Sequence, residues 1–456
     1  MSWEPKVEAD HAPSSQLHKY ALTPTDELKP AHRNARRHSP KQIQAIVKSI
    51  EQVGAINPIV IDGDRRIVAG HGRWQAAKIL GLRVVPTLMV ENLAESQLRL
   101  YALADNRIAE TATWDEEALA IELSELRLEA PELDLSMSGF ENPKIEFLIV
   151  GQEQTNWSDL DQEVEASHTD PVTQSGDVWD FSAGHTLVCG SSLDASEVVA
   201  ALNGATAQLV IEDPPYNLKE REYSGNGRHR HGDFAMGAGE LDQEGFRRFL
   251  AEGHRVILPH LADGALLFRF IDGKHVGDVI DAGQRAGLQL KNVIVWDKGK
   301  GSLGALYRHA YELLVLFKHG KAPHINNVML GKHGRDRTDV WRYPGMNRFG
   351  KARDRALAVH ATVKPVQLIC DALLDVTRPG DVVYDGFGGS GTTLIAAEKM
   401  GRVAKVIELE PNYCDVAIER FRRAFGTEPI QRSTGLTFSQ VAAQRSFLNA
   451  GKTDGR

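Results

Sequence analysis

The chain has 456 residues, of which 42% are hydrophobic and 25% charged, with a formal net charge of −8. This composition is typical of globular proteins, and the length is sufficient for about two to four domains. No apolar run approaches the roughly 18 residues that a membrane span needs, and residues 1–16 lack the apolar core of a secretory signal.

The cysteine content and the net charge limit which metal sites, cellular compartment and binding partners are expected. Cys189, Cys370 and Cys414 are scattered without CxxC spacing. The pattern disfavours disulfides and zinc, so we expect a reducing cytoplasm and no metal. A net negative charge excludes a protein coated in positive charge, but a local basic face would still bind nucleic acid.

The N-terminal part reads as a small α/β unit at 16–110, preceded by a disordered stretch at 1–15. Helical periodicity alternates with short apolar runs, and Asp62-Gly63-Asp64 marks a hairpin turn. Helices are expected at 40–53, 70–81 and 95–105, and strands at 59–61, 67–69 and 83–86.

The middle of the chain connects two domains. Residues 111–150 carry a Leu/Ile stripe that predicts a helical connector. Residues 151–176 are polar and predict a linker. A second domain is expected at 177–430, followed by a polar, mobile tail at 431–456.

The second domain alternates short, continuous apolar strands with helices. Strands are expected at 186–189, 209–212, 265–270, 292–296, 313–317, 382–385 and 403–409. This pattern predicts an α/β fold in which a mostly parallel, doubly wound sheet is buried between helices.

One strand ends in groups that suit a flat polar ligand. Asp213-Pro214-Pro215-Tyr216 follows the apolar run 209–211. Asp213 and the Pro214 carbonyl can accept hydrogen bonds from an amino group, and Tyr216 can stack on a ring. Together they suit a nucleobase that has left its helix, although a proline loop explains a four-residue match equally simply.

Two stretches are candidates for DNA contact. Residues 218–246 are rich in glycine and hold Arg228 and Arg230, and residues 332–355 hold eight basic against three acidic residues. Arg335 and Arg337 are the candidates in the second stretch. A solvated loop is the alternative for both. His229 and His231 lack the partners that a metal site requires.

A glycine-rich turn joins another strand to a helix. Asp385-Gly386-Phe387-Gly388-Gly389-Ser390-Gly391-Thr392-Thr393 follows the strand at 382–384. Glycines at such a turn aim N–H groups at a ligand. Glu408 lies about 20 residues further on, where dinucleotide folds place the residue that binds ribose hydroxyls; Glu410 is the alternative.

Combined, these motifs resemble the permuted beta type of amino-methylating DNA methyltransferase, in which Asp-Pro-Pro-Tyr precedes the cofactor loop. The resemblance covers about 177–425 and implies a Rossmann-like domain with a mixed, mostly parallel sheet that uses S-adenosyl-L-methionine. Further segments resemble those of the family at 296–298, 307–312, 360–366 and 406–413.

The resemblance implies a division of roles within the site. The residues implied as catalytic are Asp213, Pro214, Pro215 and Tyr216. The residues implied in cofactor binding are Asp385, Phe387, Gly388, Gly389, Ser390, Gly391, Thr392, Glu408, Lys364 and Pro365. The family's usual Gly-Asp beside the cofactor adenine is Gly190-Ser191-Ser192 here, with Asp194 as a substitute, and Gly386 replaces a commoner proline.

The implied reaction is direct methyl transfer to a flipped base in double-stranded DNA, without a metal or a covalent intermediate. Asp at the first motif position favours adenine N6 over cytosine N4 in this family. The alternatives are cytosine-N4 transfer and a ParB-type DNA-binding or partition module with an inactive methyltransferase half. A dinucleotide oxidoreductase leaves Asp213-Pro214-Pro215-Tyr216 unexplained. Oligomeric state stays open, with a homodimer as one alternative.

The N-terminal unit resembles the ParB N-terminal domain over about 16–110. The resemblance rests on Gly70-His71-Gly72-Arg73-Trp74-Gln75-Ala76-Ala77 and Ala104-Asp105-Asn106-Arg107. Glycines at a helix start with an Arg nearby suit a phosphate group, so Arg73 and Arg107 are the candidates. Gly-His-Gly-Arg departs from the family's Gly-Glu-Arg-Arg, which leaves nucleotide binding and a DNA-docking or regulatory module as alternatives.

Overall fold

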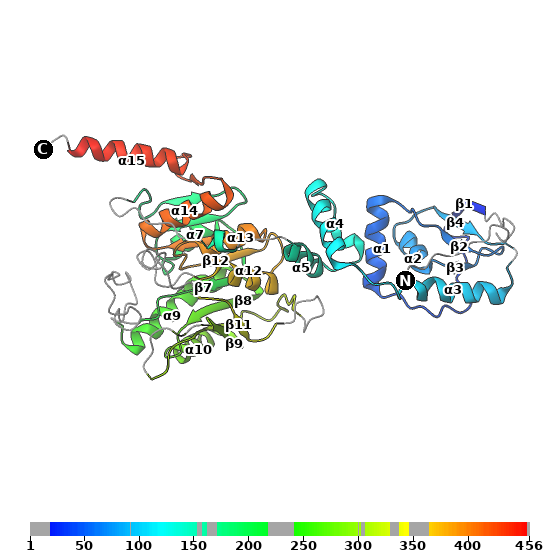
Figure 1. Ribbon diagram of the computed structural model, residues 1–456, viewed down its shortest axis with the longest axis horizontal. Helices are drawn as coiled ribbons and strands as arrows, with labels where there is room; N and C mark the ends of the chain where they lie inside the picture. The colour runs from blue at the N-terminus through cyan, green and yellow to red at the C-terminus, as the bar shows by residue number, and fades with distance from the viewer. Residues whose placement is uncertain are drawn as a thin grey trace, which may run out of the picture. The chain divides into compact units, whose positions relative to one another are not determined.

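The computed structural model describes residues 19–91, 93–152, 157–161, 171–217, 241–299, 301, 306–328, 337–345 and 364–453. The chain divides into two compact units, at Met1–Glu153 and Gln154–Arg456 (Figure 1). No helix within the described ranges is long and apolar enough to cross a membrane.

The first unit contains a four-stranded sheet of order β1-β4-β2-β3. Its elements are β1 (Lys19–Pro24), α1 (Pro40–Val53), β2 (Ile59–Ile61), β3 (Ile67–Ala69), α2 (His71–Ile79), β4 (Val84–Met89) and α3 (Glu95–Ala109). The helices and inner strands lie where periodicity predicts them. The edge strand β1 was not predicted, because most of its residues are exposed and it lacks an apolar run.

Local chemistry sets the ends of α1. The Ser39 side chain accepts a hydrogen bond from the Gln42 N–H, Pro40 occupies the first turn, and Gly54 ends the helix with φ of 81°. Beyond α3, the unit continues with α4 (Glu116–Glu129), the 3-10 helix η1 (Leu135–Ser138) and α5 (Asn142–Gln152). Ala120 and Leu123 of α4 share a buried cluster with α5.

The second unit is built on a ten-stranded sheet of order β11-β9-β10-β8-β7-β12-β13-β6-β5-β14. The strands are β5 (Val178–Asp180), β6 (Thr186–Cys189), β7 (Ala207–Glu212), β8 (Leu261–Ile271), β9 (Gln289–Asp297), β10 (Tyr311–Lys318), β11 (Val340–Arg342), β12 (Val382–Asp385), β13 (Val403–Glu408) and β14 (Ile430–Gln431). The stretch from β8 to β6 through β7, β12 and β13 is parallel, whereas β10 pairs antiparallel with both β8 and β9. The predicted α/β fold is confirmed, with a mixed sheet.

The helices of this unit are α6 (Trp157–Leu160), α7 (Ala195–Leu202), α9 (Gln243–Ile257), α10 (Val276–Arg285), α12 (Val366–Val376), α13 (Thr392–Lys399), α14 (Pro411–Phe425) and α15 (Phe438–Thr453). The crossovers through α7 and α9 run in one direction along the sheet, and the crossover through α13 runs in the other. Because parallel crossovers are right-handed, these helices cover opposite faces.

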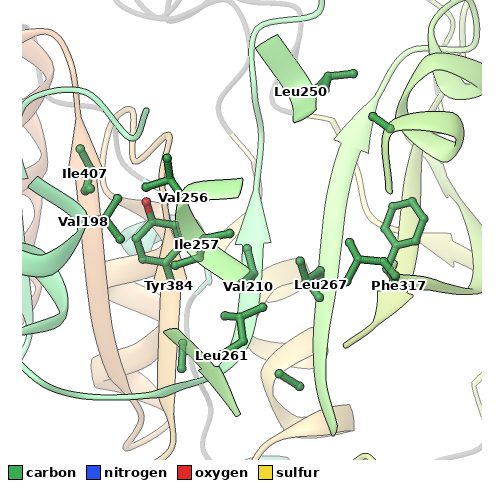
Figure 2. Close-up of a cluster of buried hydrophobic side chains, with 14 of the residues drawn as sticks. Val198, Val210, Leu250, Val256, Ile257, Leu261, Leu267, Phe317, Tyr384 and Ile407 are labelled. Atoms are coloured by element: carbon green, nitrogen blue, oxygen red, sulfur yellow. The ribbon is translucent and has the colours of Figure 1, made fainter. Parts of the chain in front are cut away.

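One hydrophobic core of the second unit lies between the sheet and the helices α7, α9 and α10. Val210 of β7 and Leu267 of β8 pack there with Val198 of α7 and Phe317 of β10 (Figure 2). These strand residues are fully or almost fully buried. Burial of this kind contributes about 1.5–3 kcal/mol for each large apolar side chain. The core fixes the strand ends that carry the polar motifs.

The C-terminal segment differs from the mobile tail expected at 431–456. It forms β14, which pairs with β5, and α15. Phe438 lies edge-on to the buried Trp179 ring at a centroid distance of 5.3 Å, and Val441 is buried. The sequence signal was weak because only a few apolar residues anchor an otherwise polar segment.

Candidate active site

The two main motifs lie at neighbouring strand ends. β7 and β12 are parallel neighbours, with Leu209 opposite Val383. Asp213 follows β7, and Asp385 ends β12. After β7 the chain continues to β8 on one side, and after β12 it continues to β13 on the other. This point, where the direction of winding reverses, is where open α/β sheets bind ligands.

Asp213 and Tyr216 form the centre of the site. The Tyr216 hydroxyl donates to Asp213 Oδ1 at 2.7 Å and lies 3.1 Å from Glu312 Oε2. The Lys364 ammonium forms a short hydrogen bond to Asp213 Oδ2. Pro214 is buried beside them. Each oxygen of Asp213 thus has a protein partner.

A second carboxylate, which sequence reasoning left without a role, completes this cluster. Glu312 lies in β10 opposite Trp296 of β9, and its side chain is 12% exposed. Lys298 pairs with Glu312 Oε1, and Lys364 lies 3.3 Å from Glu312 Oε2. Glu312 and Lys298 lie in segments, 307–312 and 296–298, that the family resemblance covers. The additional signal was a charged residue near the start of an otherwise apolar strand.

Electrostatics fix the protonation of the cluster. Burial raises the pKa of Asp213, Lys364 opposes this effect, and Glu312 adds to it. Burial also acts to raise the pKa of Glu312, but Lys364 and Lys298 outweigh it and lower that pKa to about 2. The pKa of Tyr216 lies well above its usual value because of burial and both carboxylates, so the hydroxyl keeps its proton.

Lys364 also packs against aromatic rings. Its ammonium lies 5.1 Å from the centroid of Phe270 and 5.9 Å from that of Trp296. Cation–π contacts of this length favour the charged amine. Burial acts to lower the pKa of Lys364, but the two carboxylates outweigh it and raise that pKa. The side chain expected at the cofactor therefore points at Asp213.

The turn after Asp213-Pro214-Pro215-Tyr216 is also defined. Asn217 adopts a left-handed conformation with φ of 55°. Its side-chain amide donates to the Leu241 carbonyl at 2.8 Å and accepts from the Leu241 N–H at 3.2 Å. Asn is the non-glycine residue that tolerates this conformation best. Asn217 therefore joins the end of the motif to the segment that leads into α9.

Asp385 stabilises the glycine-rich turn after β12 through hydrogen bonds. One Asp385 oxygen accepts from the Phe387 N–H at 3.0 Å, and the other accepts from the Thr393 hydroxyl at 2.6 Å. A Cβ on Gly388 would lie 2.3 Å from the Val406 side chain. Gly391 has φ of 81°. These positions require glycine for close packing and for a left-handed backbone.

Glu408, at the end of β13, faces this turn. Its carboxylate accepts from the Gly389 N–H at 2.6 Å and from the Glu410 N–H at 2.8 Å. Glu410 is the N-cap residue of α14. Of the two acidic residues weighed from the sequence, Glu408 is the one next to the glycine turn. Burial is the main cause that raises the pKa of both Glu408 and Asp385 to about 7.

Ser390 and Thr392 link the glycine turn to neighbouring elements. Arg420 of α14 donates to the Ser390 carbonyl at 2.7 Å and to its hydroxyl at 2.8 Å. The Thr392 hydroxyl lies 3.5 Å from the Lys364 carbonyl. Pro365, the next residue, is the N-cap of α12. The Lys364 backbone therefore borders the cofactor side, while its side chain reaches the acceptor side.

The departures from the family pattern have local explanations. The Ser191 N–H donates to the Glu197 carboxylate in a short hydrogen bond. Asp194 caps α7, with its carboxylate 2.8 Å from the Ser196 N–H. A Cβ on Gly386 would lie 2.8 Å from Ser192 Cβ and 2.9 Å from Glu212 Oε1, so a proline would not fit without a shift.

One candidate for DNA contact is engaged inside the protein. The Arg337 side chain is 18% exposed, forms an ion pair with Asp375 at 2.9 Å, and donates to the Tyr343 hydroxyl at 2.8 Å. It also lies over the Trp341 ring at 4.5 Å. This arrangement disagrees with the expected phosphate contact and indicates a structural role at β11. Arg228, Arg230 and Arg335 lie outside the described residues.

In the first unit, Arg73 lies over the start of α2. A Cβ on Gly70 would lie 3.0 Å from an Arg73 terminal nitrogen, and Gly70 caps the helix without a side-chain hydrogen bond. Arg73 Nε is buried without a hydrogen-bond partner among the described residues. Arg107 of α3 is exposed and forms an ion pair with Glu110 at 3.1 Å.

Comparison with known families divides the chain into three matches. A family model described as DNA methylase matches residues 207–419. A model described as ParB N-terminal domain matches residues 9–107. A model described as ParB-methyltransferase HTH domain matches residues 117–175.

Similar proteins match different parts of the chain. It is 41% identical over 83 residues to the ParB-like nuclease domain-containing protein YnaK of Escherichia coli (strain K12), covering 18% of this chain and 95% of that one. It is 28% identical over 164 residues to the type II methyltransferase M2.MboI of Moraxella bovis, covering 33% of this chain and 58% of that relative's length. The crystal structure of the M1.HpyAVI–SAM complex is 20% identical, with a TM-score of 0.37, covering 50% of this chain and 96% of that one.

Proposed function

The chain belongs to the N6/N4 DNA methylases and carries a ParB-like N-terminal domain, and from this premise we propose that it methylates the N6 amino group of adenine at specific sites in duplex DNA, using S-adenosyl-L-methionine. The observation that carries the proposal is the pairing of Asp213-Pro214-Pro215-Tyr216 with the glycine turn of β12 at one sheet edge. An amine-binding side and a nucleoside-binding side then face each other.

The residues of the cofactor side fit the proposed group. A Cβ on Gly388 would lie 2.3 Å from the Val406 side chain, so the turn packs closely on β13, and Glu408 presents its carboxylate at the Gly389 N–H. Glu408 would accept hydrogen bonds from ribose hydroxyls. Bound S-adenosyl-L-methionine would supply an electrophilic methyl group.

The acceptor side orients the amino nitrogen. Asp213 and the Pro214 carbonyl each accept one amino hydrogen, and Tyr216 stacks on the flipped base. Both hydrogen bonds direct the nitrogen lone pair away from the ring and toward the methyl group. The new N–CH3 bond forms as the S–CH3 bond breaks, and the amine then loses a proton to water. Positioning and electrostatics carry the catalysis.

We also propose that the ParB-like unit binds a phosphate group at the start of α2. The support is the helix start at Gly70, which has no side-chain cap, and Arg73 Nε, which is buried without a hydrogen-bond partner in the described part of the chain. A nucleotide and the DNA backbone share this chemistry. Either would link recognition in the first unit to methylation in the second.

Modified-base sequencing tests the proposed reaction. Host DNA is sequenced after expression of the wild type and of Asp213→Ala, with melting curves to show that both fold. N6-methyladenine in a fixed sequence with the wild type alone is the expected result. N4-methylcytosine instead would identify the alternative base. No modified base with either protein, together with DNA binding that needs no cofactor, would favour a DNA-binding or partition module.

A further inference from the structure

Glu312 lies close to both groups that form hydrogen bonds with the Asp213 carboxylate. The Tyr216 hydroxyl and the Lys364 ammonium bind the two oxygens of Asp213, and the same two groups lie 3.1 and 3.3 Å from a single oxygen, Glu312 Oε2. Lys298 holds the other oxygen, Oε1. Glu312 is therefore anchored on one side and presents its second oxygen to the acceptor site.

The Tyr216 hydroxyl has one proton and two carboxylates within reach. It donates to Asp213 at 2.7 Å, and Glu312 lies 0.4 Å further away. A phenol can donate to only one of them at a time. A target amine that binds Asp213 would compete with Tyr216 and Lys364 for the same carboxylate.

We propose that Glu312 is a positioning residue that takes over the Tyr216 hydroxyl and the Lys364 ammonium when Asp213 turns to the target amine. The inference rests on the proposed function and adds a residue to it. Neither group loses its hydrogen-bond partner in this exchange, because Glu312 Oε2 is already beside both. Asp213 is thereby released without an uncompensated buried donor.

Charge supports the exchange. Asp213, Glu312, Lys298 and Lys364 carry two negative and two positive charges, so the cluster is neutral whichever carboxylate the Lys364 ammonium prefers. Asp385 of β12 is a further titratable group, and the charge of Asp213 contributes to its raised pKa. Removing the charge of Glu312 would leave the two lysines with only Asp213 and would tighten the Lys364–Asp213 pair.

The test begins with Glu312→Gln, which keeps the shape and removes the charge. We expect kcat for methyl transfer to fall about 10- to 100-fold, since the acceptor groups are then mispositioned. Cofactor affinity, measured by calorimetry, should change less than about twofold, because the contacts that Glu312 makes among the described residues are with Tyr216, Lys298 and Lys364 and not with the glycine turn. Glu252→Gln is the matched control, since Glu252 pairs with Arg255 on the surface of α9.

A pH profile separates positioning from simple loss of structure. Glu312 contributes to the raised pKa of Asp213. Without its charge, the Asp213 pKa falls, and the acidic limb of kcat should move to lower pH. Glu312→Asp is the second variant, for use if Glu312→Gln destabilises the protein. It keeps the charge but shortens the reach to Tyr216, so we expect a folded protein with a lower kcat.

Double mutants decide the exchange itself. In a Tyr216→Phe background the hydroxyl is absent, so Glu312→Gln should lower kcat by a smaller factor than it does in the wild type. If Glu312→Gln lowers kcat by the same factor in both backgrounds and does not shift the acidic limb of the pH profile, the proposal is overturned and the methyltransferase assignment stays intact. A folded wild type that transfers no methyl group would overturn both.

Discussion

Lys364 and Asp213 form a buried ion pair that joins the start of α12 to the end of β7 across 151 residues of sequence. Replacing Lys364 with Gln should lower the free energy of unfolding by about 3 kcal/mol, because a buried carboxylate then loses its main cation. The pKa of Asp213 should rise, so the acidic limb of methyl transfer should move to higher pH. Denaturant titration and a pH–rate profile measure the two effects.

The control for this pair is Lys41→Gln, at an exposed ion pair with Glu141. Exposed pairs contribute about 0–1 kcal/mol. Equal stability losses at Lys364 and Lys41 would show that the pair with Asp213 is not structurally important. An unmoved acidic limb would show that Lys364 does not control the ionisation of Asp213.

Cofactor affinity should depend on pH through Glu408. Its pKa of about 7 means that the carboxylate gains a proton as the pH falls through neutrality. A protonated carboxyl offers fewer acceptors for ribose hydroxyls. The dissociation constant of S-adenosyl-L-methionine should therefore rise about tenfold between pH 8 and pH 6. Calorimetry at several pH values measures it.

Glu408→Gln provides the control for this titration. The variant should bind more weakly at pH 8 and show a shallower pH dependence, with Asp385 as the remaining group whose pKa is about 7. The same steep profile in Glu408→Gln would assign the effect to a group other than Glu408.

Gly391 should be sensitive to a single methyl group. Its φ of 81° disfavours other residues, and a Cβ there would lie 2.6 Å from the Ala417 Cβ. We expect Gly391→Ala to lower stability by about 2–4 kcal/mol through backbone strain and overlap. Gly401→Ala is the matched control: φ is 65°, but the space is open, so about 1–2 kcal/mol is expected. Equal losses in thermal unfolding would contradict the packing explanation.

The sequence predicts most inner strands of both sheets because each contains a short run of apolar residues, and in strands such as β6 and β7 these residues are buried. The short strands β5, β11 and β14 escape prediction, because none of them has more than two consecutive apolar residues, and β11 and β14 lie at the edges of the ten-stranded sheet. Helix α15 escapes because a few contacts, such as Phe438 on Trp179, hold a polar segment.

The candidate site shows the same division. Asp213-Pro214-Pro215-Tyr216 and the glycine turn are local patterns, so the sequence reveals them. Glu312 and Lys298 come together only because β9 and β10 pair antiparallel, with Glu312 opposite Trp296. Arg337 shows the converse: a basic stretch in sequence suggests an exposed cation, but tertiary contacts bury it against Asp375.

Arg73 should carry phosphate binding in the ParB-like unit. Arg73→Ala removes a guanidinium whose Nε has no partner among the described residues, so little stability should be lost. Binding of a nucleoside triphosphate or of non-specific duplex DNA should weaken about tenfold or more, since charge-assisted hydrogen bonds to phosphate are lost. Fluorescence titrations with each ligand distinguish the two sources. Arg107→Ala, at an exposed pair with Glu110, is the comparison. Unchanged binding of both ligands by Arg73→Ala would exclude a phosphate site there.

The affinity for S-adenosyl-L-methionine should increase only when Ser191 and Glu197 are substituted together. In the family pattern an Asp stands where this chain has Ser191, but here the Ser191 N–H is held by the Glu197 carboxylate. An Asp introduced at 191 would lie close to that negative charge, so Ser191→Asp alone should not tighten cofactor binding. Ser191→Asp with Glu197→Gln removes the repulsion and should bind S-adenosyl-L-methionine more tightly than either single variant. Asp194→Ala should leave affinity unchanged, because Asp194 caps α7. If Ser191→Asp alone tightens binding, Glu197 does not control this edge; if Asp194→Ala weakens it, Asp194 supplies the missing contact.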